Sequence, residues 1–321
     1  MSLTNMNKAF FINGGAGRTL CSVPALENYA NDHPEDDFII VCEGGTDFYK
    51  GHPKLHFRAY DVWHKNLFNE YLKDRQLITP EPYRVWEYYN QQCNIAQAYD
   101  IEINGKGLRT LNKPKIYLSK EELIMARQMI KEIKETTKKE KLVVFQPFGR
   151  VSKKDNDSFI DVSGRSFELE NIASIIRQLG KQHAVMLMSE FPIDLNKHQI
   201  NFPVAVPQGV HVRIWSAVIK MCDHFLGCDS LGQHLANAFD KTATVVFGST
   251  FPQNVSYPDN NKFDIIDMNK YSRIYSPIRI TMDEYADRAN EDAMQMNTEV
   301  ENRIVQSVNS MIKHGYKKNK K

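Results

Sequence analysis

One stretch of the chain, residues 226–252, restricts the possible folds more than any other. It passes from a short apolar run through Asp229-Ser230 into a helix-like segment that carries His234, and then into a second apolar run and a Gly-Ser-Thr turn. This pattern is typical of a buried parallel strand, a loop, a short helix and a second buried strand. The loop would present hydroxyls, backbone N–H groups and one imidazole at a helix N-terminus, where the helix dipole attracts anions. We therefore expect an anion site here, with a diphosphate as its ligand.

Buried strands and amphipathic helices alternate in the rest of the chain as well. In the first half, residues 9–12 and 37–42 are apolar runs that flank a segment of helical spacing. In the second half, a new series of strands, loops and helices starts at Val143. Between the halves, Ser119-Lys-Glu-Glu122 has the pattern of a capping box and opens a charged helix. We predict an α/β protein with two Rossmann-like, doubly wound domains that face a cleft.

Composition and charge argue against several classes of protein. No apolar run approaches the roughly 20 residues that a membrane-spanning helix needs, and the first residues lack the apolar segment of a secretory signal. The five cysteines have no paired spacing, so we expect neither a disulfide framework nor a zinc site, and we expect a cytoplasmic protein. The net charge of +2 is too small to indicate a nucleic-acid-binding protein by itself.

Three loops that follow predicted strands carry side chains suited to a phosphorylated ligand, and they should meet because ligands bind beyond the carboxyl ends of parallel strands. The first combines a glycine turn with a hydroxyl and cations, which suit phosphate, although a solvated basic loop is the alternative. The second offers a carboxylate that can accept both hydroxyls of a ribose, although most such carboxylates are merely exposed. The candidates are Gly149, Arg150, Ser152 and Lys153 in the first loop, Glu190 in the second, and Asp229, Ser230 and His234 in the third.

The third loop also resembles a known sequence pattern. In the heptosyltransferase-like (family 9) glycosyltransferases, the nucleotide-sugar loop reads Asp-Ser/Thr-Gly-Pro-x-His-Leu-Ala, followed by an apolar strand and Phe-Gly-x-Thr-x-Pro. In this chain Leu231-Gly232 replaces the Gly-Pro. Residues 143–258 keep the order of the family's carboxyl-terminal motifs, with Arg165-Ser-Phe167 where the family has Lys-x-Trp. The matching residues of the third loop are Asp229, Ser230, His234, Leu235, Ala236, Phe247, Gly248, Thr250 and Pro252.

The resemblance implies a glycosyltransferase of the GT-B arrangement that takes a nucleotide-diphospho-sugar as co-substrate. It further implies inversion at the anomeric carbon and no need for a metal ion or other cofactor, and it leaves the type of sugar open. The candidates of the three loops would then bind the donor. The implied domains are an acceptor-binding domain in residues 1–118, a connecting helix in 119–140, a nucleotide-sugar-binding domain in 141–282, and closing helices with a basic tail in 283–321.

The first half departs from the family at the position expected to meet the acceptor. The family reads Gly-x-Gly-Asp there, and its aspartate is taken as the general base, whereas this chain has Gly15-Ala-Gly17-Arg18. Arginine does not give up its proton in proteins, so Arg18 cannot act as a base. Three explanations are open: another carboxylate serves as the base, Arg18 binds a phosphate of the acceptor, or catalysis is lost. The candidate bases are Glu43, Asp47 and Asp61.

The acceptor is expected to be anionic or hydroxylated. Residues 61–100 are rich in aromatic side chains, locally basic and expected to be largely helical. Aromatic rings offer stacking surfaces for sugar rings or unstacked bases, although such a segment more often forms core. The acceptor we favour is a hydroxymethylated base in bacteriophage-type DNA, followed by a saccharide of the lipopolysaccharide core.

Two other functions are compatible with the sequence. Gly15-x-Gly17 followed by Glu43 after the next strand resembles a dinucleotide fingerprint, which would make the chain an NAD-dependent Rossmann oxidoreductase. The third glycine of that fingerprint is absent near Leu20, and this interpretation leaves the second half unexplained. The replacement at Arg18 is also compatible with a non-catalytic sugar-nucleotide binder.

Overall fold

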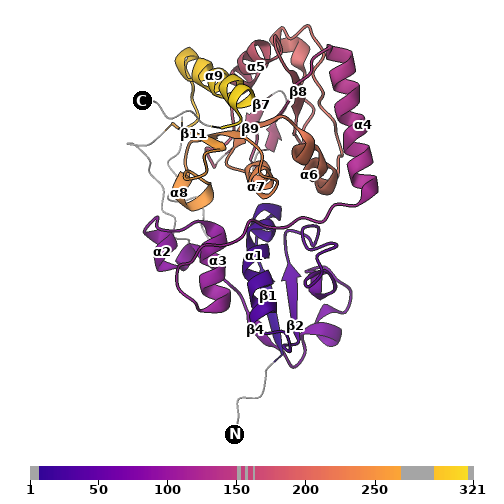
Figure 1. Cartoon of the computed structure of the whole chain (residues 1–321), viewed down its shortest axis with the longest axis vertical. Helices are drawn as coiled ribbons and strands as arrows, with labels where there is room; N and C mark the ends of the chain where they lie inside the picture. The colour runs from indigo at the N-terminus through magenta and orange to yellow at the C-terminus, as the bar shows by residue number, and fades with distance from the viewer. Residues whose placement is uncertain (1–6, 150–152, 156–157, 162, 269–292, 317–321) are drawn as a thin grey trace. The chain divides into compact units, whose positions relative to one another are not determined.

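The computed structural model describes residues 7–149, 153–155, 158–161, 163–268 and 293–316. The chain divides into two compact units, Met1–Leu118 and Ser119–Lys321. Each unit is built on a parallel sheet with helices packed against it (Figure 1). The predicted α/β class with two Rossmann-like domains is therefore confirmed, because strands and helices alternate along both units.

The sheet of the first unit has the strand order β3-β2-β1-β4, with parallel pairing throughout. Helix α1 (Ala16–Asp32) covers one face, where the ring of Tyr29 packs 4.9 Å from that of Phe10 and 5.1 Å from that of Phe38. Helix α3 (Ile95–Asn104) packs along α1. The strands are β1 (Lys8–Ile12), β2 (Phe38–Cys42), β3 (Ala59–Asp61) and β4 (Gln76–Ile78).

The other face of this sheet is covered by irregular chain. Ala9, Ile39 and Val41 form a small buried cluster there, under partly buried side chains from residues 60–72. Our expectation of a largely helical segment over residues 61–100 was wrong before α3. Strand β4 forms within it, and Pro80 and Pro82 lack the N–H that a continuing helix needs. The short elements of this region are η1 (His56–Arg58), the π-helical turn η2 (Phe68–Leu72), η3 (Pro82–Arg84) and α2 (Trp86–Tyr89).

The sheet of the second unit has the strand order β11-β10-β9-β5-β8 and is also parallel. Strands β5, β8, β9 and β10 are buried along their whole length, as expected for strands covered on both faces. An antiparallel pair, β6 (Lys153–Asp155) and β7 (Ser158–Ile160), follows β5. The strands of the parallel sheet are β5 (Leu142–Gln146), β8 (Ala184–Leu187), β9 (His224–Cys228), β10 (Ala243–Phe247) and β11 (Phe263–Asp267).

Two groups of helices pack on this second sheet. Helices α5 and α9 pack together over a core that includes Phe145 and Leu226. Helices α4, α6 and α7 form a row, and Arg213 of α6 donates from Nη2 to Glu122 of α4 at 2.9 Å. The helix predicted to connect the halves thus packs within the second unit. The helical segments are α4 (Lys120–Thr137), α5 (Leu169–Leu179), η4 (Leu195–His198), α6 (Val212–Met221), α7 (Leu231–Ala238), α8 (Pro252–Val255) and α9 (Thr298–His314).

The predicted closing segment contains α9, whereas residues 283–292 and 317–321 lie outside the described residues. In the part of the chain that the structure describes, no helix has both the length and the apolar character that crossing a membrane requires.

Candidate active site

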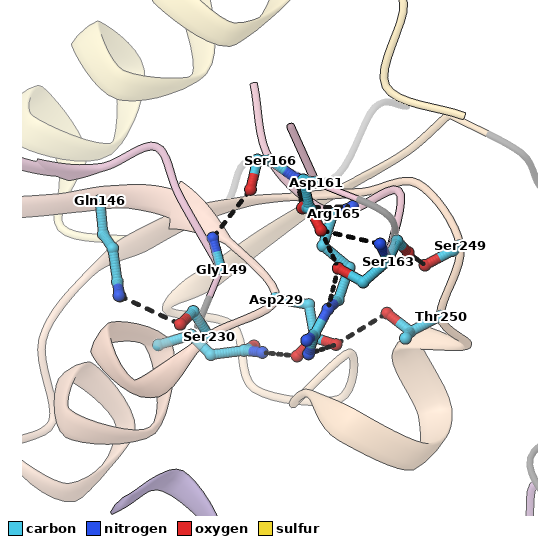
Figure 2. A network of polar contacts seen from close by, with 11 residues as sticks. Gln146, Gly149, Asp161, Ser163, Arg165, Ser166, Asp229, Ser230, Ser249 and Thr250 are labelled. Atoms are coloured by element: carbon cyan, nitrogen blue, oxygen red, sulfur yellow. Dashed lines mark hydrogen bonds and ion pairs between the residues drawn. The ribbon is translucent and has the colours of Figure 1, made fainter. Parts of the chain in front are cut away.

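The carboxyl ends of the strands in the second unit carry a network of polar contacts (Figure 2). Gln146, the last residue of β5, donates from Nε2 to Ser230 Oγ at 3.1 Å and accepts at Oε1 from the N–H of Gly232 at 2.8 Å. One side chain therefore ties the end of β5 to the first turn of α7. A Cβ at Gly232 would lie 2.4 Å from the ring of Phe225, so only glycine fits this contact.

Asp229, which follows β9, lies at the centre of the network (Figure 2). Its buried carboxylate accepts from Gln233 Nε2 at 2.8 Å and from Thr250 Oγ1 at 2.9 Å. The guanidinium of Arg165 lies 3.7 Å from the same carboxylate as an ion pair. A lone carboxylate would repel a bound diphosphate, and Arg165 offsets that charge. The carboxylate of Asp229 thus contacts groups of the protein, and its role in binding the nucleotide-sugar stays a prediction.

A tight turn between β7 and α5 presents Arg165 to this network. Asp161 accepts from the backbone N–H groups of Ser163 at 2.8 Å, Arg165 at 3.2 Å and Ser166 at 2.8 Å. Gly164 allows the turn because its φ of 63° lies in the left-handed region. Burial by itself would raise the pKa of Asp161, but the hydrogen bonds from Ser163 and Ser166 outweigh it and lower the pKa, so Asp161 is ionised.

Arg165 is a functional candidate that is not among the site residues predicted from the sequence. Its Nε donates to Ser163 Oγ at 3.0 Å, and its side chain is 23% exposed. The neighbouring Ser166 accepts from the N–H of Gly149 at 2.9 Å, which joins the turn to the loop after β5. The sequence does carry a signal for the turn, since Asp-x-Ser-Gly is a pattern in which the aspartate caps nearby N–H groups.

His234 lies one turn into α7 and is buried. Its Nδ1 is 2.9 Å from Tyr257 Oη, and which of the two atoms donates depends on the tautomer of the imidazole. Burial lowers the pKa of His234 to about 4, against a smaller opposing effect of Asp229. The imidazole is therefore neutral at physiological pH, and it can exchange a hydrogen bond with a ligand but cannot supply a positive charge.

Two of the other predicted donor residues, Glu190 and Lys153, lie in described parts of the chain. Glu190 follows β8, which pairs with β5, and it is exposed. Lys153 begins β6. Arg150 and Ser152 lie outside the described residues. The structure therefore brings Gly149, Asp229 and Ser230 into one network, with His234 on the adjoining helix.

The loop predicted to meet the acceptor follows β1 in the first unit. Gly14 has a φ of 88°, and Gly15 caps α1 with Gly17 in its first turn. Glu43 follows β2, is exposed, and accepts from the N–H of Gly14. This contact holds the Glu43 carboxylate against the loop that was predicted to meet the acceptor.

Two further carboxylates follow the neighbouring strand ends. Asp61 ends β3 opposite Cys42 of β2, and it accepts from the N–H of Trp63 at 2.8 Å. Asp47 lies in the loop after Glu43 and is half-buried. The three predicted bases therefore share the carboxyl edge of one sheet, where ligands of parallel sheets bind.

Arg18 is held among aromatic side chains. Its Nε donates to Tyr99 Oη at 2.9 Å, its Nη2 lies 3.4 Å from Glu81, and its guanidinium stacks 4.9 Å from the ring centre of Tyr83. Burial alone would lower the pKa of Arg18, but Tyr99, Tyr83 and Glu81 outweigh it and raise the pKa. Arg18 is therefore permanently charged and engaged with its own unit.

Comparisons with known proteins show which fold these elements form. No protein-family model matches the chain, and no curated protein sequence matches it. A solved glycosyl transferase family 9 structure from Veillonella parvula is similar over 97% of this chain and 98% of its own, with a TM-score of 0.68 and 12% identity. The chain has the fold of the family 9 glycosyltransferases.

Two further solved structures agree with this fold. The E. coli ADP-heptose lps heptosyltransferase II matches over 97% of this chain and 99% of its own, with a TM-score of 0.62 and 11% identity. The E. coli heptosyltransferase WaaC with ADP matches over 94% and 100%, with a TM-score of 0.51 and 13% identity. The resemblance that the motifs of residues 143–258 indicated is thus confirmed at the level of the fold.

Proposed function

We propose that the protein is a glycosyltransferase that moves a sugar from a nucleotide-diphospho-sugar to an acceptor hydroxyl. The observation that carries this proposal is the network at the carboxyl edge of the second sheet, where Arg165 and the start of α7 meet beside Asp229. A fixed guanidinium and a helix N-terminus are the groups that bind a diphosphate most directly. The solved proteins of this fold include a heptosyltransferase with ADP, which supports the same ligand class here.

In this proposal the second unit stabilises the departing nucleoside diphosphate. Negative charge develops on the diphosphate as the bond to the sugar breaks, and fixed positive groups lower the free energy of that transition state. Arg165 and the first turn of α7 would supply these groups from the protein, so transfer would need no metal ion. Glu190 would accept hydroxyls of the ribose, and neutral His234 would contribute a hydrogen bond.

We assign the general base to Glu43. Its carboxylate is exposed and accepts from the N–H of Gly14, so it lies beside the loop in which the family carries its aspartate. It would remove the proton of the acceptor hydroxyl while that oxygen attacks the anomeric carbon from the face opposite the diphosphate. A single displacement of this kind inverts the configuration. Arg18 is not assigned to an acceptor phosphate, since Glu81 and Tyr99 already engage it.

The acceptor in this proposal is a polyhydroxylated compound such as a saccharide. Glu43, Asp47 and Asp61 make the acceptor edge acidic, and carboxylates bind hydroxyls but repel the phosphates of DNA. Trp63, two residues after Asp61, is 88% exposed and offers a flat surface for a sugar ring. The alternative acceptor, a modified base in DNA, predicts binding to plain duplex DNA that weakens steeply between low and high salt. Absence of such binding supports the saccharide.

The first experiment is a thermal-shift screen against ADP-, UDP-, GDP- and CDP-sugars, with NAD as the control. A ligand that binds only the folded chain raises the melting temperature by mass action. A shift with one sugar nucleotide supports the proposal and identifies the donor for an acceptor search. A shift with NAD alone supports an oxidoreductase, and no shift with any sugar nucleotide contradicts the proposed function.

A further inference from the structure

Arg165 is connected to Asp161 through a single buried hydroxyl. The Nε of Arg165 donates to Ser163 Oγ at 3.0 Å, and the same Oγ donates to the carboxylate of Asp161 (Figure 2). Ser163 is fully buried, so water does not compete for either bond. The three side chains form a chain of carboxylate, hydroxyl and guanidinium.

The hydroxyl in the middle is held in place by contacts on its own backbone. The N–H of Ser163 donates to Asp161 at 2.8 Å, and its carbonyl oxygen accepts from Ser249 Oγ at 2.6 Å. Gly248 brings this second loop close, because a Cβ there would lie 2.4 Å from the carbonyl oxygen of Gly164. Ser163 is thus held by a hydrogen bond within its own turn after β7 and by a second one from the loop after β10.

Asp161 reaches the guanidinium of Arg165 through the Ser163 hydroxyl. A direct bidentate pair would instead occupy two N–H groups of the guanidinium. On its other side, Arg165 Nη1 stands 3.7 Å from Asp229, which is an ion pair longer than a hydrogen bond. The guanidinium is thus held by a hydrogen bond at Nε and by a longer ion pair at Nη1.

We propose that Asp161 and Ser163 are positioning residues that hold the guanidinium of Arg165 ready for the donor diphosphate. This inference rests on the proposed function and adds two residues to its site. A free arginine side chain has many conformations, and ordering it on binding lowers affinity. The chain of hydrogen bonds orders it before the ligand arrives, so the diphosphate meets a fixed cation.

Binding measurements on the full chain test this role without an acceptor. The ligands are the nucleoside diphosphate of the base found in the thermal-shift screen and the nucleoside of the same base, measured by calorimetry and by competition. The variants are Ser163→Ala, Asp161→Asn and Arg165→Gln. Ser216→Ala is the matched control, because Ser216 is also a fully buried serine, and its hydroxyl donates within α6 to the carbonyl of Val212 at 2.8 Å.

We expect the diphosphate to lose affinity while the nucleoside does not. Arg165→Gln should weaken diphosphate binding by roughly 30-fold or more, since a charge-assisted hydrogen bond is lost. Ser163→Ala and Asp161→Asn should weaken it by roughly fivefold to tenfold, and nucleoside affinity should stay within about twofold in all three variants. Ser216→Ala should change neither affinity by more than about twofold.

Several results would overturn the inference. Wild-type diphosphate affinity in Ser163→Ala or Arg165→Gln would show that the hydrogen-bonded side chains of Asp161, Ser163 and Arg165 do not act on the ligand. A parallel loss of diphosphate and nucleoside affinity in Ser163→Ala would assign Ser163 a structural role only. If Asp161→Asn fails to fold, Ser163→Ala still tests the inference. That variant removes a single oxygen atom, and comparing its melting temperature with that of Ser216→Ala shows whether it is folded. Absence of nucleoside diphosphate binding in the wild type would instead contradict the proposed function itself.

Discussion

Two buried histidines in the second unit are kept neutral by their surroundings. His224 contacts the hydroxyls of Thr242 at 2.9 Å and Thr244 at 3.0 Å, and burial lowers its pKa to about 3, with His183 and Lys241 acting in the same direction. His234 is buried beside Tyr257, and its pKa is lowered to about 4. A charged imidazole in either place would be poorly solvated, so acid should destabilise the fold.

The direction of this pH effect follows from the order of protonation. Because both folded-state pKa values lie below the ordinary value of 6.5, the unfolded chain takes up these protons first as the pH falls. The stability contributed by the neutral histidines is complete above about pH 6.5 and is lost as the pH falls toward the folded-state values. At about pH 5 we expect each histidine to have lowered the free energy of unfolding by about 2 kcal/mol.

Chemical denaturation at about pH 7 and about pH 5 measures this loss. In His224→Gln, which cannot titrate, the loss between the two pH values should be smaller than in the wild type by about 2 kcal/mol. His64→Gln, at an exposed position, should behave like the wild type. An unchanged pH dependence in His224→Gln would contradict the prediction.

The assignment of the base is also a prediction about one residue. Glu43→Gln keeps the size of the side chain but cannot accept a proton, so kcat should fall by roughly 100-fold or more while donor affinity is unchanged. Asp47→Asn and Asp61→Asn are the matched variants at the same sheet edge, and each should keep kcat within about tenfold of the wild type. A loss of kcat confined to Asp61→Asn or Asp47→Asn would move the base to that residue.

At the scale of elements, the start of α7 depends on close packing. Gln146 binds the N–H of Gly232 at 2.8 Å, and a side chain at this position would meet Gln146 Oε1 at 2.6 Å as well as the Phe225 ring. The first turn of α7 would therefore have to move away from β5. That movement would also disturb the groups proposed to face the diphosphate.

Gly232→Ala should lower the free energy of unfolding by about 1–3 kcal/mol, as overpacking of a buried contact does. It should also weaken binding of the nucleoside diphosphate. Gly149→Ala is the matched control for stability, because its Cβ would meet no described atom closer than 3.8 Å, and we expect a change within about 0.5 kcal/mol. Equal stability of the two variants in chemical denaturation would refute the packing argument.

At the scale of the whole molecule, the two units have separate sheets and separate cores. The described residues of the proposed donor site lie in residues 119–321, together with a large hydrophobic cluster that includes Phe145, Ile176 and Val308. A unit with its own core can fold alone. The second unit should therefore retain donor binding without the first.

Residues 119–321 expressed alone should bind the nucleoside diphosphate with an affinity within about tenfold of the full chain, and residues 1–118 alone should not bind it. Calorimetry with both fragments measures this. A folded second unit that binds no nucleotide would place an essential part of the donor site in residues 1–118.

The element types were largely predictable because their signals are local. The apolar runs at residues 37–42 and 143–145 became the buried strands β2 and β5, and the Ser119–Glu122 capping box begins α4 as expected. Residues 61–100 were not predictable in this way. Their aromatic side chains divide between buried Tyr88 and exposed Trp63, and burial of that kind depends on what packs against them rather than on spacing.

The sequence by itself determined the α/β class, the two-sheet organisation and the loops after the strands, since hydrophobic period and capping act over a few residues. Only the tertiary structure decided what surrounds Arg165. Ser163 and Ser249 are 86 residues apart in the chain. They meet because the turn after β7 is tied to the loop after β5, and β5 and β10 end at the same edge of the parallel sheet. Hydrogen bonds and ion pairs between such distant loops leave no periodic signal in the sequence. The Asp-x-Ser-Gly turn has a local signal, but the contacts of Ser163 with Ser249 and of Arg165 with Asp229 became visible only in the folded chain.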